Sequence, residues 1–312
     1  MTATPTPPNA AGAPASGRGG SIFDLGYQSY TGPRLGRRSA VQALFTQTIR
    51  ACFGIGRGGR AKIAPFTLAA LAVLPAILAV GIAAIASQSG GAVGDASPIR
   101  YENYHGLVGI LIMLFCAAQA PELFGRDQRY GVLPLYFSRV LTRPDYALAK
   151  VLGLFLALLA VDLAPYIILF VGRVFVAPDP ASGLSAELGA VPRFLAQGVL
   201  VAGLLGGIAS LIAAWTPRRA YATATIIAAF IIPPIIVGLI GTLTNQDLAR
   251  FIVLFSPGDV LDGTNAALFG SISENPVVSA IGLPGWAYIA AAVVGIVVTV
   301  GLTVRRYLRI AT

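Results

Sequence analysis

Charged residues, histidine and cysteine are all scarce in this chain of 312 residues. Only 11% of its residues are charged, whereas a soluble domain has roughly 25%. Its single histidine, His105, cannot form a metal site by itself, because such sites need several ligands. Two cysteines cannot form a disulfide framework. We expect Cys52 and Cys116 to stay unpaired, because Cys52 precedes the first long apolar stretch and Cys116 lies inside the second.

Motifs for nucleotide binding and for nucleophilic catalysis are also missing. No Walker A sequence occurs in the chain. Residues 54–59, "GIGRGG", match the spacing of a dinucleotide fingerprint, but that motif needs a preceding strand and an acidic residue about 20 positions later. We interpret these residues as a flexible basic hinge. With no Ser/His/Asp or Cys/His arrangement either, we expect no enzyme and no cofactor bound by this chain.

Apolar sequence is abundant: 56% of the residues are hydrophobic, and the mean hydropathy is +0.76. Several apolar runs are long enough to cross a hydrocarbon core roughly 30 Å thick. They lie at about 63–86, 103–120, 148–172, 193–215, 220–243 and 286–304. The sequence therefore predicts an all-α integral membrane protein, with a six-helix transmembrane domain over residues 63–312.

The region before the first span divides into two parts. Residues 1–35 begin "MTATPTPPNAAGAPASGRGG", which lacks the basic-then-apolar order of a signal peptide. Their Pro, Ala, Gly and Ser content predicts a disordered cytoplasmic tail. Residues 36–62 are predicted to form an amphipathic helix followed by the basic hinge.

The amphipathic helix is predicted from an apolar stripe at helical spacing. The stripe consists of Val41, Leu44, Phe45, Thr48, Ile49 and Cys52. Because arginines flank it and a span follows, we expect the helix to lie in the cytoplasmic membrane interface with its stripe in the lipid boundary.

The orientation of the spans follows from the distribution of Lys and Arg. One side of the predicted bundle carries 18 of the 22 basic residues, from both termini, residues 121–150 and the turn "TPRR" at 216–219. Basic residues are enriched in cytoplasmic loops, so we expect both termini and residues 121–150 in the cytoplasm of a multi-pass plasma-membrane protein. The formal net charge of +9 is then a topology signal, and no nucleic-acid partner is expected.

Residues 121–150, which we call the charged loop, hold eight charged side chains. Leu133, Tyr136, Phe137 and Val140 share one face of a predicted short helix. An amphipathic helix of this kind suits insertion into a groove on a partner protein. A capping hydroxyl, a first-turn proline and an acid near the positive helix end at 142–145 predict the start of the third span.

A mixed-sign cluster precedes that short helix. It consists of Glu122, Arg126, Asp127 and Arg129. We expect these side chains to form a network that holds the angle of the loop. The alternative is a solvated loop whose arginines only determine topology.

The charged loop resembles the cytoplasmic loop of ABC-2 type transporter permeases. The residues that carry the resemblance are Glu122, Arg126-Asp127, Gly131-Val132-Leu133, Ser138-Arg139, Thr142-Arg143-Pro144-Asp145-Tyr146 and Lys150. Together with the six spans and the preceding helix, it covers about residues 35–312.

The resemblance implies a function and a set of partners. Residues 133–142 are, by resemblance, a coupling helix that docks on an ATPase subunit. Its candidate contact residues are Leu133, Leu135, Tyr136, Phe137, Arg139 and Val140. The chain would be the permease of an ATP-binding-cassette exporter, with two ATPase subunits that hold ATP and Mg, and a second permease copy or paralogue, in the lipid bilayer. The apolar spans suit a lipid, a drug-like molecule or a hydrophobic peptide equally.

Two further features leave alternatives open. Asp162 is the one acid deep in a predicted span; such residues usually face the bundle interior, where it could line a substrate path or only bond a neighbouring helix. Residues 244–285 alternate short apolar segments with Pro and Gly. They either enter the bundle as part of an outer gate or pack on top of it.

Two other functions remain as alternatives to the permease. An ion-coupled secondary transporter would use Asp162 as its coupling acid, although no convincing internal repeat is present. A non-transporting membrane anchor of a larger complex would use the charged loop only as a tether.

Overall fold

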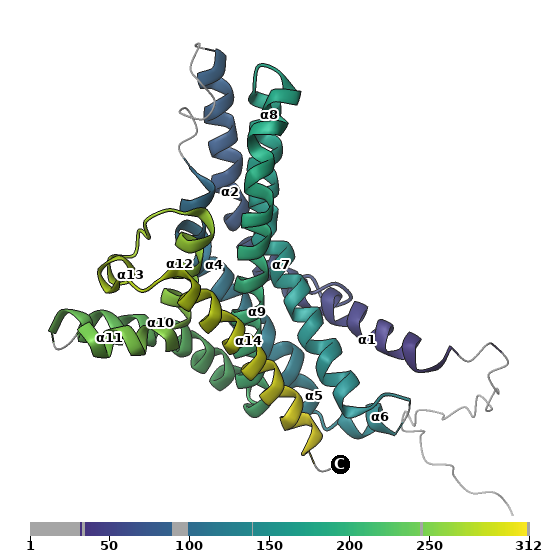
Figure 1. The fold of residues 1–312 in the computed structure, drawn as a ribbon. Helices are drawn as coiled ribbons and strands as arrows, with labels where there is room; N and C mark the ends of the chain where they lie inside the picture. The colour runs from purple at the N-terminus through teal and green to yellow at the C-terminus, as the bar shows by residue number, and fades with distance from the viewer. Residues whose placement is uncertain (1–31, 33–34, 89–98, 139, 244–245, 311–312) are drawn as a thin grey trace, which may run out of the picture. The chain divides into compact units, whose positions relative to one another are not determined.

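The computed structural model of the chain describes residues 32, 35–88, 99–138, 140–243 and 246–310. The predicted tail lies almost entirely outside these residues, as does Arg139. The chain divides after Arg34, and all the helices belong to the second unit, Leu35–Thr312 (Figure 1). Every regular element of the described part is a helix, which confirms the all-α class.

The elements have the following bounds. In chain order they are α1 (Gly36–Cys52), α2 (Arg60–Gln88), α4 (Tyr101–Ala120), the π-helix η1 (Pro121–Gly125), α5 (Arg126–Arg129), α6 (Leu133–Phe137), α7 (Arg143–Val176), α8 (Pro180–Glu187), the 3-10 helix η2 (Leu188–Ala190), α9 (Val191–Trp215), α10 (Arg219–Leu243), α11 (Gln246–Ile252), the 3-10 helix η3 (Val253–Phe255), α12 (Pro257–Phe269), α13 (Pro276–Ile281) and α14 (Gly285–Leu308).

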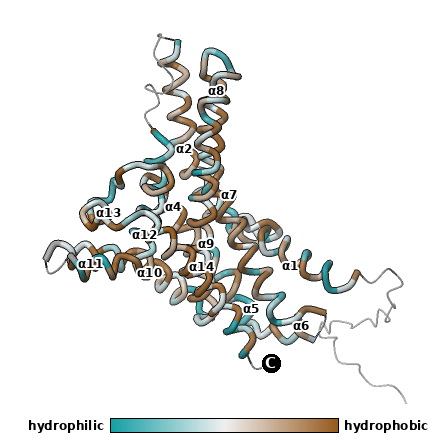
Figure 2. Tube along the Cα trace, viewed as in Figure 1, coloured by the Kyte–Doolittle hydropathy of each residue, from teal (hydrophilic) through white to brown (hydrophobic). Residues whose placement is uncertain are grey.

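Six of these helical stretches are long and apolar enough to cross a membrane. They correspond to α2, α4, α7, α9, α10 and α14, and each overlaps one of the predicted spans. Figure 2 shows hydrophobic residues along these helices and hydrophilic residues around α5, α8 and the segment between α12 and α13. Within the described residues, the expected number of helices that are long and apolar enough to span a membrane is therefore confirmed.

Helices α7 and α9 occupy the centre of the bundle. Helix α7 packs against α1, α2 and α9, and α9 packs in turn against α12 and α14. Large apolar side chains on the outer helices are exposed instead, among them Ile77 on α2, Ile235 on α10 and Val297 on α14. Contiguous exposed apolar surface of this kind is typical of a lipid or protein contact.

The apolar stripe of α1 is covered by protein rather than left open to lipid. Leu44, Thr48 and Cys52 are buried, and the Thr48 side chain lies where a Cβ on Gly153 of α7 would have to be. The prediction that the whole stripe lies in the lipid boundary is therefore wrong, because α7 presents a surface that fits it. The position of α1 at the membrane interface stays a prediction.

The segment between α10 and α14 enters the bundle. Helix α12 packs against α4, α9, α10 and α14, and its Leu261 is fully buried in the main core. The carbonyl oxygen of Leu261 accepts a hydrogen bond from Gln197 Nε2 on α9 at 3.3 Å. Of the two alternatives for residues 244–285, this packing favours entry among the spans over a loop on top of them.

Candidate functional site

The charged loop is built from three short helical pieces. Helix α4 continues through η1 and α5, so that one helical stretch runs from Tyr101 to Arg129. Gly131, with a φ of +64°, then reverses the chain, and α6 begins at Leu133 with Pro134 in its first turn. Both the short helix and its proline start are as predicted.

The short helix is nevertheless shorter than residues 133–142. It ends at Phe137, because the chain must reach Thr142, whose extended backbone (ψ 161°) is the N-cap of α7. The Thr142 N–H donates to Asp145 Oδ2 at 3.1 Å, and Pro144 stands in the first turn. This start of α7 confirms the prediction made from residues 142–145.

The six candidate contact residues are divided between the interior and the surface. Leu133 is only 5% exposed, whereas Leu135 is 68% and Val140 54% exposed. The rings of Tyr136 and Phe137 pack on Tyr146 of α7, with centroids 5.3 and 5.8 Å away. Arg139 lies outside the described residues.

The predicted docking face therefore mainly attaches α6 to α7. Three apolar side chains of the charged loop remain exposed, and we call this set the exposed loop patch: Tyr130 (65% exposed), Leu135 and Val140.

Glu122 is the acceptor at the centre of the first charge network. Its carboxylate lies 2.9 Å from Arg57 Nη1, 3.7 Å from Arg126 Nη1 and 3.6 Å from Arg219 Nη1. Arg57 comes from the turn between α1 and α2, and Arg219 starts α10. One glutamate thus joins the hinge, the charged loop and the fifth span.

Asp127 is the acceptor at the centre of the second network. Its Oδ2 accepts from Lys150 Nζ at 2.8 Å and from the Tyr146 hydroxyl at 2.6 Å. Lys150 Nζ also donates to the Leu123 carbonyl oxygen at 2.8 Å. Both Asp127 and Lys150 are largely buried, so their pairing fixes the start of α7 against α5.

Arg129, the fourth member of the predicted cluster, is not part of either network. Its guanidinium lies over the Tyr130 ring, 5.1 Å from the centroid. The prediction of a bracing cluster therefore matches the contacts of Glu122, Arg126 and Asp127, and differs for Arg129.

Hydrogen bonds that are not ion pairs also join the charged loop to the ends of α9 and α14. Gln128 Nε2 donates to the Ala214 carbonyl oxygen at 3.0 Å and to the Tyr307 hydroxyl at 3.1 Å. Arg143 Nη1 donates to the Leu308 carbonyl oxygen at 3.0 Å. The last turn of α14 therefore lies at the same end of the bundle as the charged loop.

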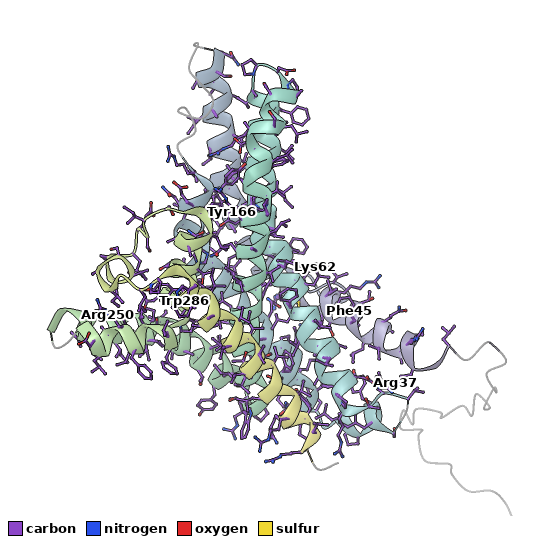
Figure 3. The ribbon with its side chains drawn as sticks, viewed as in Figure 1. Arg37, Phe45, Lys62, Tyr166, Arg250 and Trp286 are labelled. Carbon is purple, nitrogen blue, oxygen red and sulfur yellow. The ribbon has the colours of Figure 1, made fainter. Side chains whose placement is uncertain are left out.

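The N-terminal helix is attached at this end too. Arg37, labelled in Figure 3, donates from Nε and Nη2 to the two carboxylate oxygens of Asp145 at 2.7 and 2.8 Å. Together with Arg57, this pair holds both ends of α1 to the charged loop and α7.

Most partners of the acids in the charged loop were not predictable from local sequence. Arg57, Arg219 and Arg37 are, in the sequence alone, only part of the basic excess that indicates topology. The available signal was the scarcity of acids: Glu122, Asp127 and Asp145 stand among many more Lys and Arg at this end. A buried acid in such surroundings is expected to pair with more than one cation.

Asp162 lies in the bundle interior, as expected, at 1% exposure. Among the residues that the structure describes, its Oδ2 has no hydrogen-bond partner, and the same holds for Gln197 Oε1 and for the hydroxyl of Tyr166, one turn further along α7 (Figure 3). Oδ2 lies about 3.1 Å from the place of a Cβ on Gly198, so Asp162 faces α9. Whether it lines a substrate path stays a prediction.

Within the described residues, no three His, Cys, Asp or Glu side chains come close enough together to hold a metal ion. Both cysteines are buried and free, and burial raises the pKa of Cys52 to about 12, which leaves its thiol protonated at neutral pH.

Comparison with known proteins adds no family. No family model matches the chain, and no curated protein matches it. Its function is therefore argued from the charged loop and its contacts.

Proposed function

We propose that this chain is the membrane-spanning permease of an ABC-2 type ATP-binding-cassette exporter, and that the charged loop receives its ATPase subunit. The observation that carries the proposal is the exposed loop patch on a rigidly held loop. Three apolar side chains are displayed beside a helix whose other face is packed on α7.

The contacts of the loop supply the means of coupling. A displacement of the charged loop would act on α7 through Tyr146, on α10 through Glu122 and Arg219, and on α14 through Gln128 and Tyr307. Packed elements of this kind move as units. ATP-driven closure of the partner would therefore tilt several spans together.

The partners follow from this mechanism. Two ATPase subunits would hold ATP and Mg and press on the charged loops of two permeases, either two copies of this chain or one copy and a paralogue. The exposed apolar faces of α2, α10 and α14 would contact lipid or that second permease. The cytoplasmic location of the loop and termini in a plasma membrane belongs to the same proposal.

The test is co-purification with ATPase subunits encoded beside this chain. We expect wild type to bring down an ATPase, and Leu135→Glu and Val140→Glu to lose it, with about a tenfold or greater loss of ATP hydrolysis, because a charge is placed in an apolar contact. Leu188→Glu, an exposed leucine far from the loop in η2, is the matched control and should leave both unchanged.

Two outcomes would contradict the proposal, one in full and one in part. If no candidate ATPase binds the wild-type chain, the proposal is wrong as a whole. Equal binding by wild type and the two loop variants would leave an ATPase partner but move its docking surface elsewhere. Tyr136→Ala and Phe137→Ala are unsuitable alone, because both rings pack on Tyr146 and their loss would disturb α6 itself.

An ion-coupled transporter is the second candidate, and the unpartnered Oδ2 of Asp162 favours it. A buried acid without a partner is costly and often functional in a membrane protein. Liposomes that contain the chain alone should then dissipate an imposed pH gradient, followed with a trapped pH-sensitive dye. Asp162→Asn should abolish that flux; no flux from wild type would remove this candidate.

A further inference from the structure

A polar cavity lies at the end of the bundle opposite the charged loop. It has a volume of about 220 Å³ and is formed by the first turn of α4, by α12 and by the segment that joins α12 to α13. Helix α4 has 20 residues, which at 1.5 Å per residue places the cavity about 30 Å from the start of the charged loop. We call it the acidic cavity.

Three carboxylates line the acidic cavity: Glu102, Asp262 and Glu274. Arg100 Nη1 lies 3.4 Å from Glu102, and His105 Nε2 lies 3.8 Å from Asp262. Glu274 has no ion-pair partner among residues 35–88, 99–138, 140–243 and 246–310. The cavity therefore carries excess negative charge.

The carboxylate of Asp262 is held in place. Asn275 Nδ2 donates to Asp262 Oδ2 and to Asp259 Oδ1, both at 2.9 Å. Asn275 is itself the N-cap of α13, because its Oδ1 accepts from the Val277 N–H at 3.0 Å. This side of the cavity is preorganised.

Asn265 is the observation that points to a ligand. The residue is only 8% exposed and lines the cavity. Its Nδ2 donates to the Glu102 carbonyl oxygen, which fixes the amide, while its Oδ1 finds no hydrogen-bond partner in the described part of the chain. A buried carbonyl oxygen without a donor costs free energy, and a donor placed in the cavity would recover it.

The spacing of the acids favours a larger cation over a metal ion. In the described residues, no three acidic, histidine or cysteine side chains converge closely enough to chelate a metal, whereas Ca²⁺ takes six to eight oxygens at about 2.3–2.6 Å. A primary ammonium instead offers three N–H donors from one compact charge. It can serve separate carboxylates and an amide oxygen.

We propose that the acidic cavity binds a primary ammonium group on a short chain, with Glu274 and Asp262 supplying charge and Asn265 Oδ1 accepting one N–H. The volume has room for about seven water molecules at ~30 Å³ each, so the ligand is a small amine or the ethanolamine headgroup of a lipid. The proposal requires no ATPase partner and stands apart from the proposed function.

Binding is measured on the purified full-length chain in nanodiscs of phosphatidylcholine and phosphatidylglycerol, in a buffer free of primary amines. Ethanolamine is titrated calorimetrically. In a second arm, the melting temperature is compared in nanodiscs that also contain phosphatidylethanolamine, because a ligand that binds only the folded state raises it. We expect ethanolamine to bind at least about tenfold more tightly than choline, which carries the charge but no N–H.

Matched variants localise the site. Glu274→Gln, at an exposed position, should weaken ethanolamine binding about tenfold and leave the ligand-free melting temperature unchanged. Asp262→Asn, in α12, is the second variant. The control is Asp247→Asn, which removes one exposed acid from α11, outside the cavity. This variant should leave the affinity for ethanolamine within about twofold of wild type, whereas a tenfold change would correspond to ~1.4 kcal/mol.

Each outcome decides the proposal. Ethanolamine binding blocked by phosphatidylethanolamine supports the site with a lipid headgroup as its occupant, and binding unaffected by that lipid supports it with a free amine. The absence of an effect in both arms overturns the proposal. Equal affinity for ethanolamine and choline would show only a charge attraction and overturns the proposal. Calcium chloride is titrated in the same way, and tighter binding of calcium than of ethanolamine overturns the proposal in favour of a metal site. An ethanolamine affinity that is unchanged in both Glu274→Gln and Asp262→Asn overturns it too.

Discussion

Lys150 is a cation held almost entirely out of water at the start of α7. Its Nζ has two acceptors, Asp127 Oδ2 and the Leu123 carbonyl oxygen. Removal of one member of a buried ion pair leaves the other charge without compensation, whereas removal of both is better tolerated. Single and double variants of Lys150 and Asp127 can therefore measure the interaction energy between the two side chains.

We expect Lys150→Met to reduce the free energy of unfolding by about 3 kcal/mol, seen as a lower melting temperature in detergent. The double variant Lys150→Met/Asp127→Asn should recover part of that loss. Arg129→Met, which removes a cation outside both charge networks, is the control. Strictly additive effects in the double variant would show that the pair is not coupled.

Asp259 gives the stability of the protein a dependence on pH. Burial raises the pKa of this carboxyl above its ordinary value, and neighbouring Asp262 acts in the same direction, against the hydrogen bond from Asn275. The folded state then holds the proton more tightly than the unfolded state. Stability contributed by Asp259 is present below about pH 4 and is lost as pH rises through the raised pKa.

Asp259→Asn should remove this dependence, because the amide stays neutral. The melting temperature of the variant relative to wild type should therefore rise between about pH 4 and pH 7. The titratable side chains that face Asp259 are Asp262 on α12 and Tyr288 on α14, and both remain in the variant. A difference that stays constant over this range would contradict the assignment.

At the scale of elements, the turn between α1 and α2 contains two glycines with a positive φ, Gly54 and Gly56, and of the two only Gly54 is also closely packed. Gly54 has a φ of +67°, and a Cβ on it would lie 2.5 Å from the Ala61 carbonyl oxygen. Gly58, four residues later, has no neighbour within 4 Å of such a Cβ and no positive φ. The "GIGRGG" sequence is thus a tight turn rather than a flexible hinge at its first glycine.

We expect Gly54→Ala to destabilise the protein by about 1–3 kcal/mol, through left-handed backbone strain and the clash with Ala61. It should also loosen α1, because the Arg57–Glu122 contact follows directly after the turn. Thermal unfolding and limited proteolysis within residues 36–62 would measure both effects. Gly58→Ala should behave like wild type, and equal effects of the two substitutions would count against this account.

At the scale of the whole molecule, the contacts of the charged loop constrain topology. Arg37–Asp145 and Arg143–Leu308 place the start of α1, the charged loop and the end of α14 at one end of the bundle. The excess of Lys and Arg there predicts that this end is cytoplasmic.

Single cysteines in a Cys52→Ala/Cys116→Ala background test the orientation. Ser138, beside α6, and Ser279, in α13, are both exposed and stand at opposite ends of the chain's spans. A membrane-impermeant maleimide added to intact cells should label Ser279→Cys and leave Ser138→Cys unlabelled until the cells are opened. The reverse pattern would invert the topology and place the docking surface outside the cell.

Much of the candidate site was predictable because its signals are local. The capped start of α7 and the proline start of α6 depend on residues within a few positions of each other. The inward direction of Tyr136 and Phe137 was not predictable, since an amphipathic helix of five residues buries its apolar face against whichever surface is nearest. Here that surface is Tyr146 of the same chain.

The sequence by itself determined six apolar spans, their boundaries to within a few residues and the side of the bundle that carries the basic charge. These properties depend on hydropathy and charge added up over long runs of residues, so no single contact alters them. Only the tertiary structure decided which charges pair, how α12 enters the bundle and where the acidic cavity closes. These depend on contacts between distant residues, such as Arg57 with Glu122, 65 positions apart, and Gln128 with Tyr307, 179 apart. Such contacts exist only once the helices have packed.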